Sequence, residues 1–487
     1  QAGGIQQAAR YKEKGTLMNK VRYIALTDIV IPDGKTYTEV DDVESVIRLI
    51  LYSDVIDIEG IIPCTSVFKK KTSAAEKEYI HSLINAYSAV KPHLDIHSDS
   101  YPSAEYLHSV VKQGISVYGK HPGKGFADSR YSDNEGVQKI IESADSNDPR
   151  PLWIGLWGGA NTLAQAVWFV RQTRSEEQFN LFLSKLRIYG ISDQDAASRW
   201  LRENFGDRLF YIVSPSKGTT IRSNVRYFAD AAWTGISCDH QIKSNEYDYY
   251  NRHFKGARDD LVTGEWLKKN ICKGELGKLY PLPSYSMEGD TPAFLGLIPN
   301  GLNFPERPDF GGWGGRYEKK IPQKKAGLRK ERYPIWTDTS DTVIGCDKET
   351  HTGTQATVWR WREAFQNDFA ARMEWTVTDS FKAACHPPII TAERTDICVQ
   401  SGESVTLSVN IDDPDANGFD LKWFCYPEAG TASTQIQLPD AVGSTDLCFN
   451  APDITGDKAT FHIVAEVTSR GRYRLTRYCR FILTVKS

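Results

Sequence analysis

Three aspartates that follow the first apolar run of the chain have the type and spacing for metal chemistry: Asp28, Asp41 and Asp42. The apolar run is VRYIAL (21–26), and an amphipathic helix pattern begins directly after the aspartates, at 43–52. Carboxylates that a fold gathers in one place repel one another, and a hard cation usually neutralises them. We therefore expect Asp28 and Asp42 to bind Ca²⁺ and Asp41 to orient a substrate hydroxyl.

Such a site would have room for a sugar, because Ca²⁺ accepts more oxygen ligands than two aspartates supply. A water held by a metal loses a proton more readily, so Asp28 is also the predicted base that activates it. The spacing leaves a structural alternative open. In that alternative Asp33 and Gly34 form a turn, and Asp41 and Asp42 cap the helix that follows.

A later acidic segment, MEGDTPAFLG (287–296), offers a third carboxylate for the same cation. If Asp290 folds back beside Asp28 and Asp42, three carboxylates enclose the ion. A turn or a helix N-cap is the commoner role for an acidic residue before Thr-Pro, and it remains the alternative for Asp290.

Two further strand-like runs end in polar residues. LWIGLWGG leads through a glycine pair into a helix start at Asn161, where free backbone groups would face a ligand crevice. LRIYGI is followed by Asp193, Gln194 and Asp195. We expect Asp193 and Gln194 to contact substrate and Asp195 to cap a helix.

Aromatic residues are numerous, with 12 Trp and 23 Tyr in the chain. Flat rings stack on sugar faces, although many of these residues must form the core. Trp313 is flanked only by glycines in GGWGG (311–315), which predicts an accessible indole face that stacks on a sugar.

The elements that must position these side chains alternate along the chain up to about residue 220. Apolar runs typical of buried parallel strands lie at 21–26, 56–63, 94–99, 151–159, 186–191 and 208–213, and helix-like stretches include 73–90, 161–173 and 176–186. This order predicts an α/β fold with a mostly parallel sheet and helices on both faces. Ligands of such sheets bind outside the carboxyl ends of the strands, which is where Asp28 is expected.

The second half of the chain changes character twice. From about 230 to 350 it is rich in Gly, Pro and aromatic residues, and long segments of this kind tend to be functional. A strong helix pattern at 355–375 should pack back on the sheet. Short alternating runs then predict an immunoglobulin-like β-sandwich. We therefore expect an N-terminal tail at 1–20, an α/β domain at 21–385 and the sandwich at 386–487.

The nine cysteines contain no CxxC pair, which argues against a zinc knuckle. Four of them lie in the predicted sandwich: Cys398, Cys425, Cys448 and Cys479. One disulfide there and buried free thiols are equally compatible with this distribution.

Composition excludes some classes of partner. The net charge of −3 implies no broad attraction to nucleic acid or to an anionic membrane. No apolar run approaches the roughly 20 residues that span a bilayer. The polar, small-residue-rich beginning of the chain has the character of an end left by signal cleavage or by cloning.

The motifs together resemble a known fold family. TD…DD, GGANTLA, SDQDAAS and EGDTP follow one another in the order found in nucleoside hydrolases. More closely, PLPSYSMEGDTPAFLGLIPNGL, GGWGGRY and WRWREAFQNDFAARMEW resemble the bacterial family of cellulose-binding, nucleoside hydrolase-like proteins with a small carboxyl-terminal β-sandwich. The resemblance covers essentially the whole chain. It implies a secreted or periplasmic protein with a carbohydrate partner, an oligo- or polysaccharide; it does not specify an oligomeric state.

The resemblance to nucleoside hydrolases also implies roles for individual residues. That family holds calcium with an amino-terminal D-x-D-x-x-x-D-D motif and a late Asp, and cleaves a ribosyl C–N bond. Asp28 matches the middle Asp, which is a calcium ligand and the base that activates water. Asp41 and Asp42 match the closing pair, with Asp42 as the bidentate ligand. Asp290 matches the late Asp, which binds both metal and a sugar hydroxyl, and a backbone carbonyl at Asn161 completes the coordination.

The chain departs from this pattern. Leu26 replaces the first Asp, and IVIPDGKTYTEV (29–40) is inserted between Asp28 and the Asp pair. The late site reads EGD where nucleoside hydrolases often have His before Asp, so the usual leaving-group acid is either missing or replaced by Glu288, which is the predicted acid in the second case. The insertion either reshapes the pocket or marks a loss of hydrolysis with sugar binding retained.

Three functions follow as hypotheses. The first is a secreted, metal-dependent glycosidase that acts on a glycan, with a furanosidic linkage as one possibility, in which Asp28 activates water and Glu288 protonates the leaving oxygen. The second is a nucleoside hydrolase, and the third is a non-catalytic carbohydrate-binding protein on the same scaffold. An appended sandwich and many aromatic residues favour a polymer over a free nucleoside.

Overall fold

The computed structural model describes residues 20–32, 40–216, 228, 230–237, 254–282, 288–322, 330–434 and 436–487. Residues 1–19 of the predicted tail and most of the insertion at 29–40 therefore lie outside the described residues, as does the Asp33–Gly34 turn.

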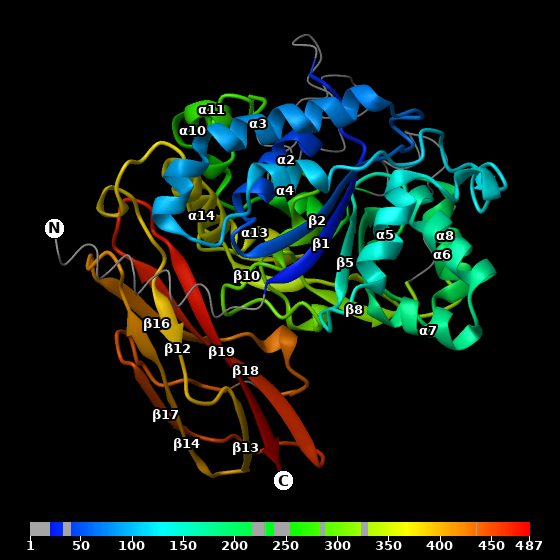
Figure 1. Cartoon of the computed structure of the whole chain (residues 1–487). Helices are drawn as coiled ribbons and strands as arrows, with labels where there is room; N and C mark the ends of the chain where they lie inside the picture. Colours follow the sequence, from blue (N-terminus) through cyan, green and yellow to red (C-terminus); the bar gives the residue numbers. More distant parts are fainter. Residues whose placement is uncertain are drawn as a thin grey trace.

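A mostly parallel sheet organises the larger part of the molecule, as predicted (Figure 1). Within the described residues it has seven strands in the order β2-β1-β5-β6-β7-β9-β8, and only β8 and β9 pair antiparallel. Its strands are β1 (Val21–Thr27), β2 (Ile56–Pro63), β5 (Leu152–Leu156), β6 (Leu186–Ser192), β7 (Phe210–Ser214), β8 (Tyr317–Lys320) and β9 (Ile335–Asp338).

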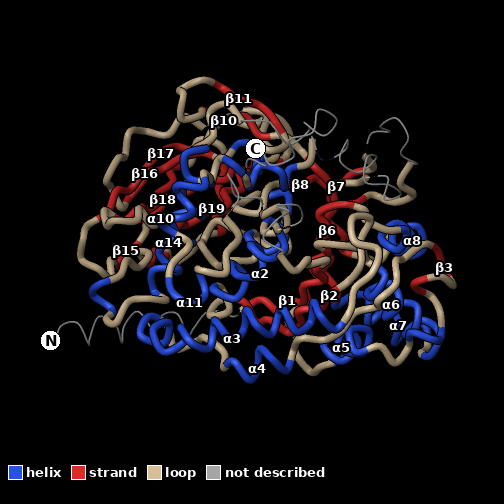
Figure 2. Tube along the Cα trace, turned by 90° about the horizontal axis from the view of Figure 1, so that it is seen from above, coloured by secondary structure: helices blue, strands red, loops and turns tan. Residues whose placement is uncertain are grey.

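The pleat of β1 shows how helices cover both faces of this sheet. Tyr23 and Ala25 enter one buried apolar cluster, and Ile24 and Leu26 enter the other. The first cluster includes residues of α2 (Asp41–Leu51), α3 (Ala74–His97) and α14 (Arg362–Trp375). The second includes residues of α5 (Glu135–Asp145), α6 (Asn161–Thr173), α7 (Glu176–Lys185) and α8 (Ala196–Phe205), which gather on the side away from the sandwich in Figure 2.

One predicted strand is wrong. The run at 94–99 does not form a strand, because α3 continues to His97, with Val90, Leu94 and His97 buried along one helical face. An apolar run this short does not distinguish a strand from a buried helix segment. The helix pattern at 355–375 is divided into α13 (Ala356–Trp359) and α14. None of the described helices is both long and apolar enough to cross a bilayer.

Shorter elements connect the main ones. They are α4 (Ala104–Ser109), β3 (His121–Pro122), β4 (Gly125–Phe126), α10 (Gly264–Asn270), α11 (Gly274–Gly277), α12 (Pro292–Leu295), β10 (Asp341–Ile344) and β11 (Thr350–Gly353), with short 3-10 turns at Ser129–Tyr131, Ala232–Ile236, Asp259–Leu261, Pro308–Phe310, Phe381–Ala383 and Pro427–Ala429.

The carboxyl-terminal strands form a smaller β-structure consistent with the predicted sandwich. Its largest sheet has the order β13-β19-β18-β16, and two-stranded sheets join β14 to β17 and β12 to β15. All pairs are antiparallel except β13 with β19. The strands are β12 (Ile389–Thr391), β13 (Asp396–Gln400), β14 (Ser404–Ser408), β15 (Asn410–Asp412), β16 (Phe419–Cys425), β17 (Asp446–Asn450), β18 (Lys458–Ser469) and β19 (Thr476–Lys486).

The cysteines of this region are free thiols. None of the eight cysteines that the structure describes forms a disulfide, including the four in the carboxyl-terminal strands. Of the two alternatives open from the sequence, the sandwich disulfide is therefore excluded for Cys398, Cys425, Cys448 and Cys479.

The carboxyl-terminal strands share a core with the α/β part. The ring of Trp361 lies 5.8 Å from that of Tyr426 and 5.7 Å from that of Tyr478. The buried guanidinium of Arg480 donates to the carbonyls of Phe310 and Gly311 at 2.6 and 2.8 Å. The two parts are thus joined by an interface of core character.

We expect Tyr426→Phe to lower the stability of the whole chain. The Tyr426 hydroxyl donates to the fully buried Asp341 at 2.6 Å, where Arg316 and Arg360 also bind. Loss of a hydrogen bond to a charged group costs about 1.5–3 kcal/mol. Chemical denaturation measures the change, and Tyr106→Phe, at a ring that is 42% exposed, is the control expected to leave stability unchanged. Equal effects of the two substitutions would contradict the prediction.

Candidate metal centre

The candidate site lies where the order of the sheet reverses. β1 has β2 on one side and β5 on the other, although β5 follows β2 in the chain. Such a switch point opens a crevice at the carboxyl ends of the strands. Asp28 directly follows β1, and α2 begins at Asp41, so that Asp41 and Asp42 occupy its first turn. The helix dipole favours carboxylates at that position.

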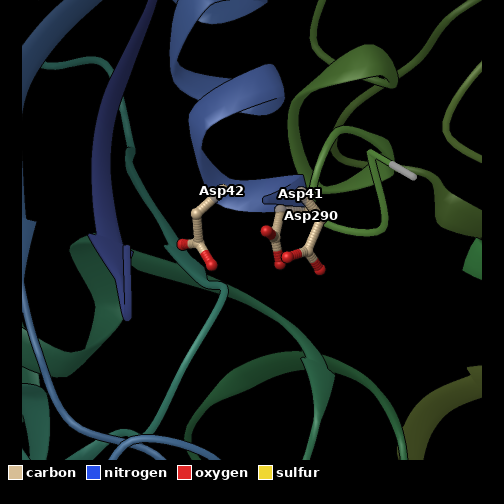
Figure 3. A group of neighbouring side chains, drawn as sticks. All are labelled: Asp41, Asp42 and Asp290. Atoms are coloured by element: carbon tan, nitrogen blue, oxygen red, sulfur yellow. The ribbon is translucent and has the colours of Figure 1, made fainter. Parts of the chain in front are cut away.

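Asp290 joins these residues from a distant part of the chain. Carboxylate oxygens of Asp41, Asp42 and Asp290 all lie within 4.8 Å of one another. Figure 3 shows the three side chains directed toward a common region, two from the start of α2 and one from the segment before α12. The Thr27 hydroxyl, at the end of β1, donates to Asp42. We call this group of three aspartates the acid cluster.

Asp28 lies beside the acid cluster rather than within it. Its carboxylate is packed against Gly158, where a Cβ atom would stand 2.6 Å from Asp28 Oδ1. Burial raises the pKa of Asp28 to about 7, and the negative charge of Asp41 adds to the rise, against a hydrogen bond with Ser66 and the charge of Lys69. Asp41, which we predicted to orient substrate, is therefore the member of the acid cluster whose charge raises the pKa of Asp28.

A lysine near this site is engaged elsewhere. The ammonium group of Lys69 donates to the carbonyl of Ile29 at 2.9 Å and pairs with Glu76 at 2.7 Å. The charge of Lys69 therefore lowers the pKa of Asp28. Its ion pair is with Glu76 and not with a carboxylate of the acid cluster.

One face of α2 fixes the segment that carries Asp290. Glu44 accepts the backbone N–H of Glu288 at 3.1 Å, and Ser45 accepts the hydroxyl of Thr291 at 3.0 Å. One turn later Arg48 pairs with the Glu288 carboxylate at 2.8 Å. Positions 41, 44, 45 and 48 share a helical face. The helix that presents two aspartates of the acid cluster therefore also holds the third in place.

These contacts do not fit the predicted role of Glu288 as a leaving-group acid. Its side chain is fully buried between Arg48 and the Tyr280 hydroxyl, which donates at 2.9 Å. Its backbone has a φ of 25°, a value that non-glycine residues adopt only under strain. Burial raises the pKa of Glu288, and Arg48 opposes that rise. The geometry makes Glu288 an anchor of the turn that precedes Asp290.

The glycine between these two residues has no room for a side chain. A Cβ atom at Gly289 would stand 2.9 Å from the ring of Trp233 and 3.5 Å from Asp41 Oδ2. Trp233 therefore borders the acid cluster, a position that the sequence did not predict.

Asn161 lies on the opposite side of the crevice, at the first residue of α6. Its backbone N–H donates to Asp195 at 3.0 Å and its side-chain amide donates to the carbonyl of Val117 at 2.9 Å. The side-chain amide of Asn161 is thus used in a hydrogen bond within the fold. The ligand role that we predicted concerns the backbone carbonyl, which is a separate group. Asp195 caps α8 through the N–H groups of Ala197 and Ser198, as predicted.

Three predicted substrate contacts have internal partners instead. Asp193 forms a two-pronged ion pair with the buried Arg202, at 2.7 and 2.9 Å, and Gln194 donates to the carbonyl of Trp157 at 2.5 Å. The prediction of an accessible ring at Trp313 is wrong, because its side chain is 0% exposed and packs near Phe365. Its flanking glycines allow close backbone packing: a Cβ atom at Gly314 would stand 2.7 Å from a backbone nitrogen.

The acid cluster fits a hard cation. Its donors are all carboxylate oxygens, which Ca²⁺ prefers. Asp41 Oδ1 is buried with no hydrogen-bond partner among the described residues. Arg48 and Lys69, which contact residues next to the acid cluster, are paired with Glu288 and Glu76.

We expect the calcium-free protein to lose stability as the pH rises from about 4 to about 7. The pKa of Asp28 is raised from 3.8 to about 7 in the folded state, so the folded chain holds a proton that the unfolded chain releases. That proton favours folding at low pH, and its contribution is lost as the pH rises, at most a few kcal/mol. Urea denaturation in a chelator measures the slope. Asp28→Asn should flatten it; an unchanged slope would contradict the assignment.

Comparison with known proteins agrees with this architecture. Residues 22–317 match the family model described as "Cellulose-binding Sde182, nucleoside hydrolase-like domain". The chain belongs to this family. Residues 404–485 match the model of its partner domain, "Cellulose-binding protein Sde0182, C-terminal domain".

A solved structure of another protein agrees with this result. A nucleoside hydrolase-related hypothetical protein from Saccharophagus degradans, described as associated with carbohydrate metabolism, is 29% identical, with 96% of this chain and 100% of that chain covered and a TM-score of 0.73. An endo-β-1,4-mannanase from Thermotoga petrophila is 9% identical over 96% of this chain and 97% of that chain, and its TM-score of 0.16 carries no structural information. No protein with a curated description matches the chain.

Proposed function

We propose that this member of the Sde182 family is a secreted or periplasmic, metal-dependent glycosidase that acts on a glycan. The observation that carries the proposal is the meeting of Asp41, Asp42 and Asp290, whose oxygens lie within 4.8 Å of one another although the chain places them far apart. A protein rarely buries such a group of like charges without a cation.

The residues around the acid cluster divide the chemistry between them. A calcium ion bound there would orient sugar hydroxyls and make a water more acidic. Asp28, at the edge of the cluster, accepts the proton of the attacking water, and its raised pKa suits a base that works near neutral pH. Trp233, which borders Asp41 through Gly289, supplies an apolar wall.

The family and one of its structural relatives support a sugar polymer as the substrate. The family is described as cellulose-binding, and the relative from Saccharophagus degradans as associated with carbohydrate metabolism. Because both parts of the chain match models of this family, a glycan is favoured over a free nucleoside.

The environment of Glu288 favours a second candidate, a non-catalytic carbohydrate-binding protein. A glycosidase of the usual kind needs an acid to protonate the leaving oxygen. The carboxyl that we predicted for this step is buried against Arg48. In this alternative the acid cluster binds sugar hydroxyls through calcium and breaks no bond.

A product assay separates the two. The full chain is incubated in Ca²⁺ with soluble plant and microbial glycans and with nucleosides, and released sugars are measured beside binding. Release from a glycan that Asp28→Asn abolishes, while binding persists, supports the glycosidase. Calcium-dependent binding without release supports the binding protein, and release from nucleosides alone would overturn both.

A further inference from the structure

A second pair of metal-type ligands lies outside the acid cluster, on helices α3 and α4. The Nδ1 atoms of His81 and His108 face each other at 2.8 Å, and the two rings lie 5.0 Å apart. Both side chains are half-buried at the surface of the molecule. Imidazole nitrogens are donors that zinc, copper and nickel prefer, and these two lie close enough to share one ion once the rings turn.

The protonation of His108 is set by a neighbour. Its Nε2 atom lies 3.1 Å from Oδ1 of Asn85, an acceptor, so the proton belongs on Nε2 and the lone pair on Nδ1 points at His81. Histidines that bind metals usually donate their other ring N–H to such an acceptor, which fixes the ring. Asn85 therefore supplies the support that a ligating His108 requires.

The spacing of the two nitrogens also fits one metal ion. Ligands with zinc–nitrogen bonds of about 2.0–2.1 Å stand roughly 3.0–3.4 Å apart in common geometries. The observed 2.8 Å reaches the lower end of that range with a small ring movement. Glu78, exposed one helical turn before His81, is on the same face of α3 and offers a carboxylate as a third ligand.

We propose that His81 and His108 form a surface site for a divalent transition metal, which joins α3 to α4. Without a metal, the proton on Nδ1 of His81 forms a hydrogen bond to Nδ1 of His108. The site is independent of the acid cluster, since its ligands are imidazole nitrogens on α3 and α4, and neither helix carries a residue of that cluster.

Calorimetric titration of the full chain with Zn²⁺, in excess Ca²⁺ to occupy oxygen sites, tests this proposal. We expect saturable binding of one Zn²⁺ per chain, a rise in thermal stability with Zn²⁺, and loss of both in His81→Ala and in His108→Ala. Asn85→Ala should weaken binding about tenfold, the cost of losing the group that orients a ligand.

His121→Ala is the matched control, because His121 is exposed and its Nδ1 contacts only its neighbour Pro122 in the described structure. It should bind Zn²⁺ as the unmodified chain does. Circular dichroism verifies that each variant is folded. The proposal is overturned by an absence of saturable binding, or by affinity retained in either of the two histidine variants.

Discussion

Asp290→Asn is expected to abolish the stabilisation of this protein by calcium. A ligand that binds only the folded chain adds about 2.7 kcal/mol when its concentration is 100 times the dissociation constant. The acid cluster has three carboxylates within 4.8 Å, and removal of one charge leaves too few anionic ligands for tight binding. Thermal unfolding with and without Ca²⁺, together with calorimetric titration, measures the loss.

The calcium-free variant should be more stable than the calcium-free original, because a neutral amide in place of the Asp290 carboxylate relieves repulsion between buried carboxylates. This opposite sign distinguishes loss of a metal ligand from general damage to the fold. Asp133→Asn, at an exposed position, removes the same charge and should leave the calcium response intact. If Asp290→Asn kept the full response to Ca²⁺, the acid cluster would not be the binding site.

The sheet was predictable because its strands obey a local rule. Buried parallel strands are continuous apolar runs, and β2 falls on the predicted 56–63 without any shift. The rule fails where a short apolar run fits either a strand or a buried helix. The run at 94–99 is such a case, because its first residue, Leu94, is buried on one face of helix α3. The β9 strand was missed because it is only four residues long, Ile335–Asp338, and lies in a stretch without clear periodicity.

The acid cluster was predictable in outline and not in detail. The convergence of Asp290 with the Asp pair was expected from the resemblance to nucleoside hydrolases, in which a late Asp joins the amino-terminal carboxylates at the metal. The burial of Trp313 was not predictable from its glycine neighbours, since glycine permits both an exposed ring and close backbone packing. The partners of Asp193 and Glu288 depend on Arg202 and Arg48, whose positions only the folded chain fixes.

One residue set was within reach of sequence analysis. Glu44, Ser45 and Arg48 follow Asp41 at helical spacings, which places all four on one face of α2. Three polar residues on the buried side of an otherwise apolar helix indicate a partner segment that is also polar. Their partner is the turn that carries Glu288 and Asp290. Substitutions in the ion pair of Arg48 and Glu288 therefore test whether α2 holds Asp290 in the acid cluster.

Glu288→Gln is expected to cost about 3–5 kcal/mol of stability, because it leaves the Arg48 charge buried without its partner. Arg48→Met should cost a similar amount for the converse reason. The double variant should lose much less than the sum, since a buried ion pair is often replaced by neutral residues at little cost. Denaturant titrations of the four proteins give the coupling free energy. Asp95→Asn, in a partly exposed pair with Lys91 on α3, is the control, with a cost of about 1 kcal/mol or less.

The same variants separate an anchoring role for Glu288 from a catalytic one. If Glu288 positions Asp290, calcium affinity falls in both single variants and recovers in the double variant, in step with stability. If Glu288 is instead a leaving-group acid, Glu288→Gln removes glycan cleavage while stability and calcium affinity stay unchanged. The backbone N–H of Glu288 that binds Glu44 is the same in Gln, so the substitution isolates the carboxylate from the turn that carries it. A neutral effect on all three measurements would show that the contact between Arg48 and Glu288 does not support the acid cluster.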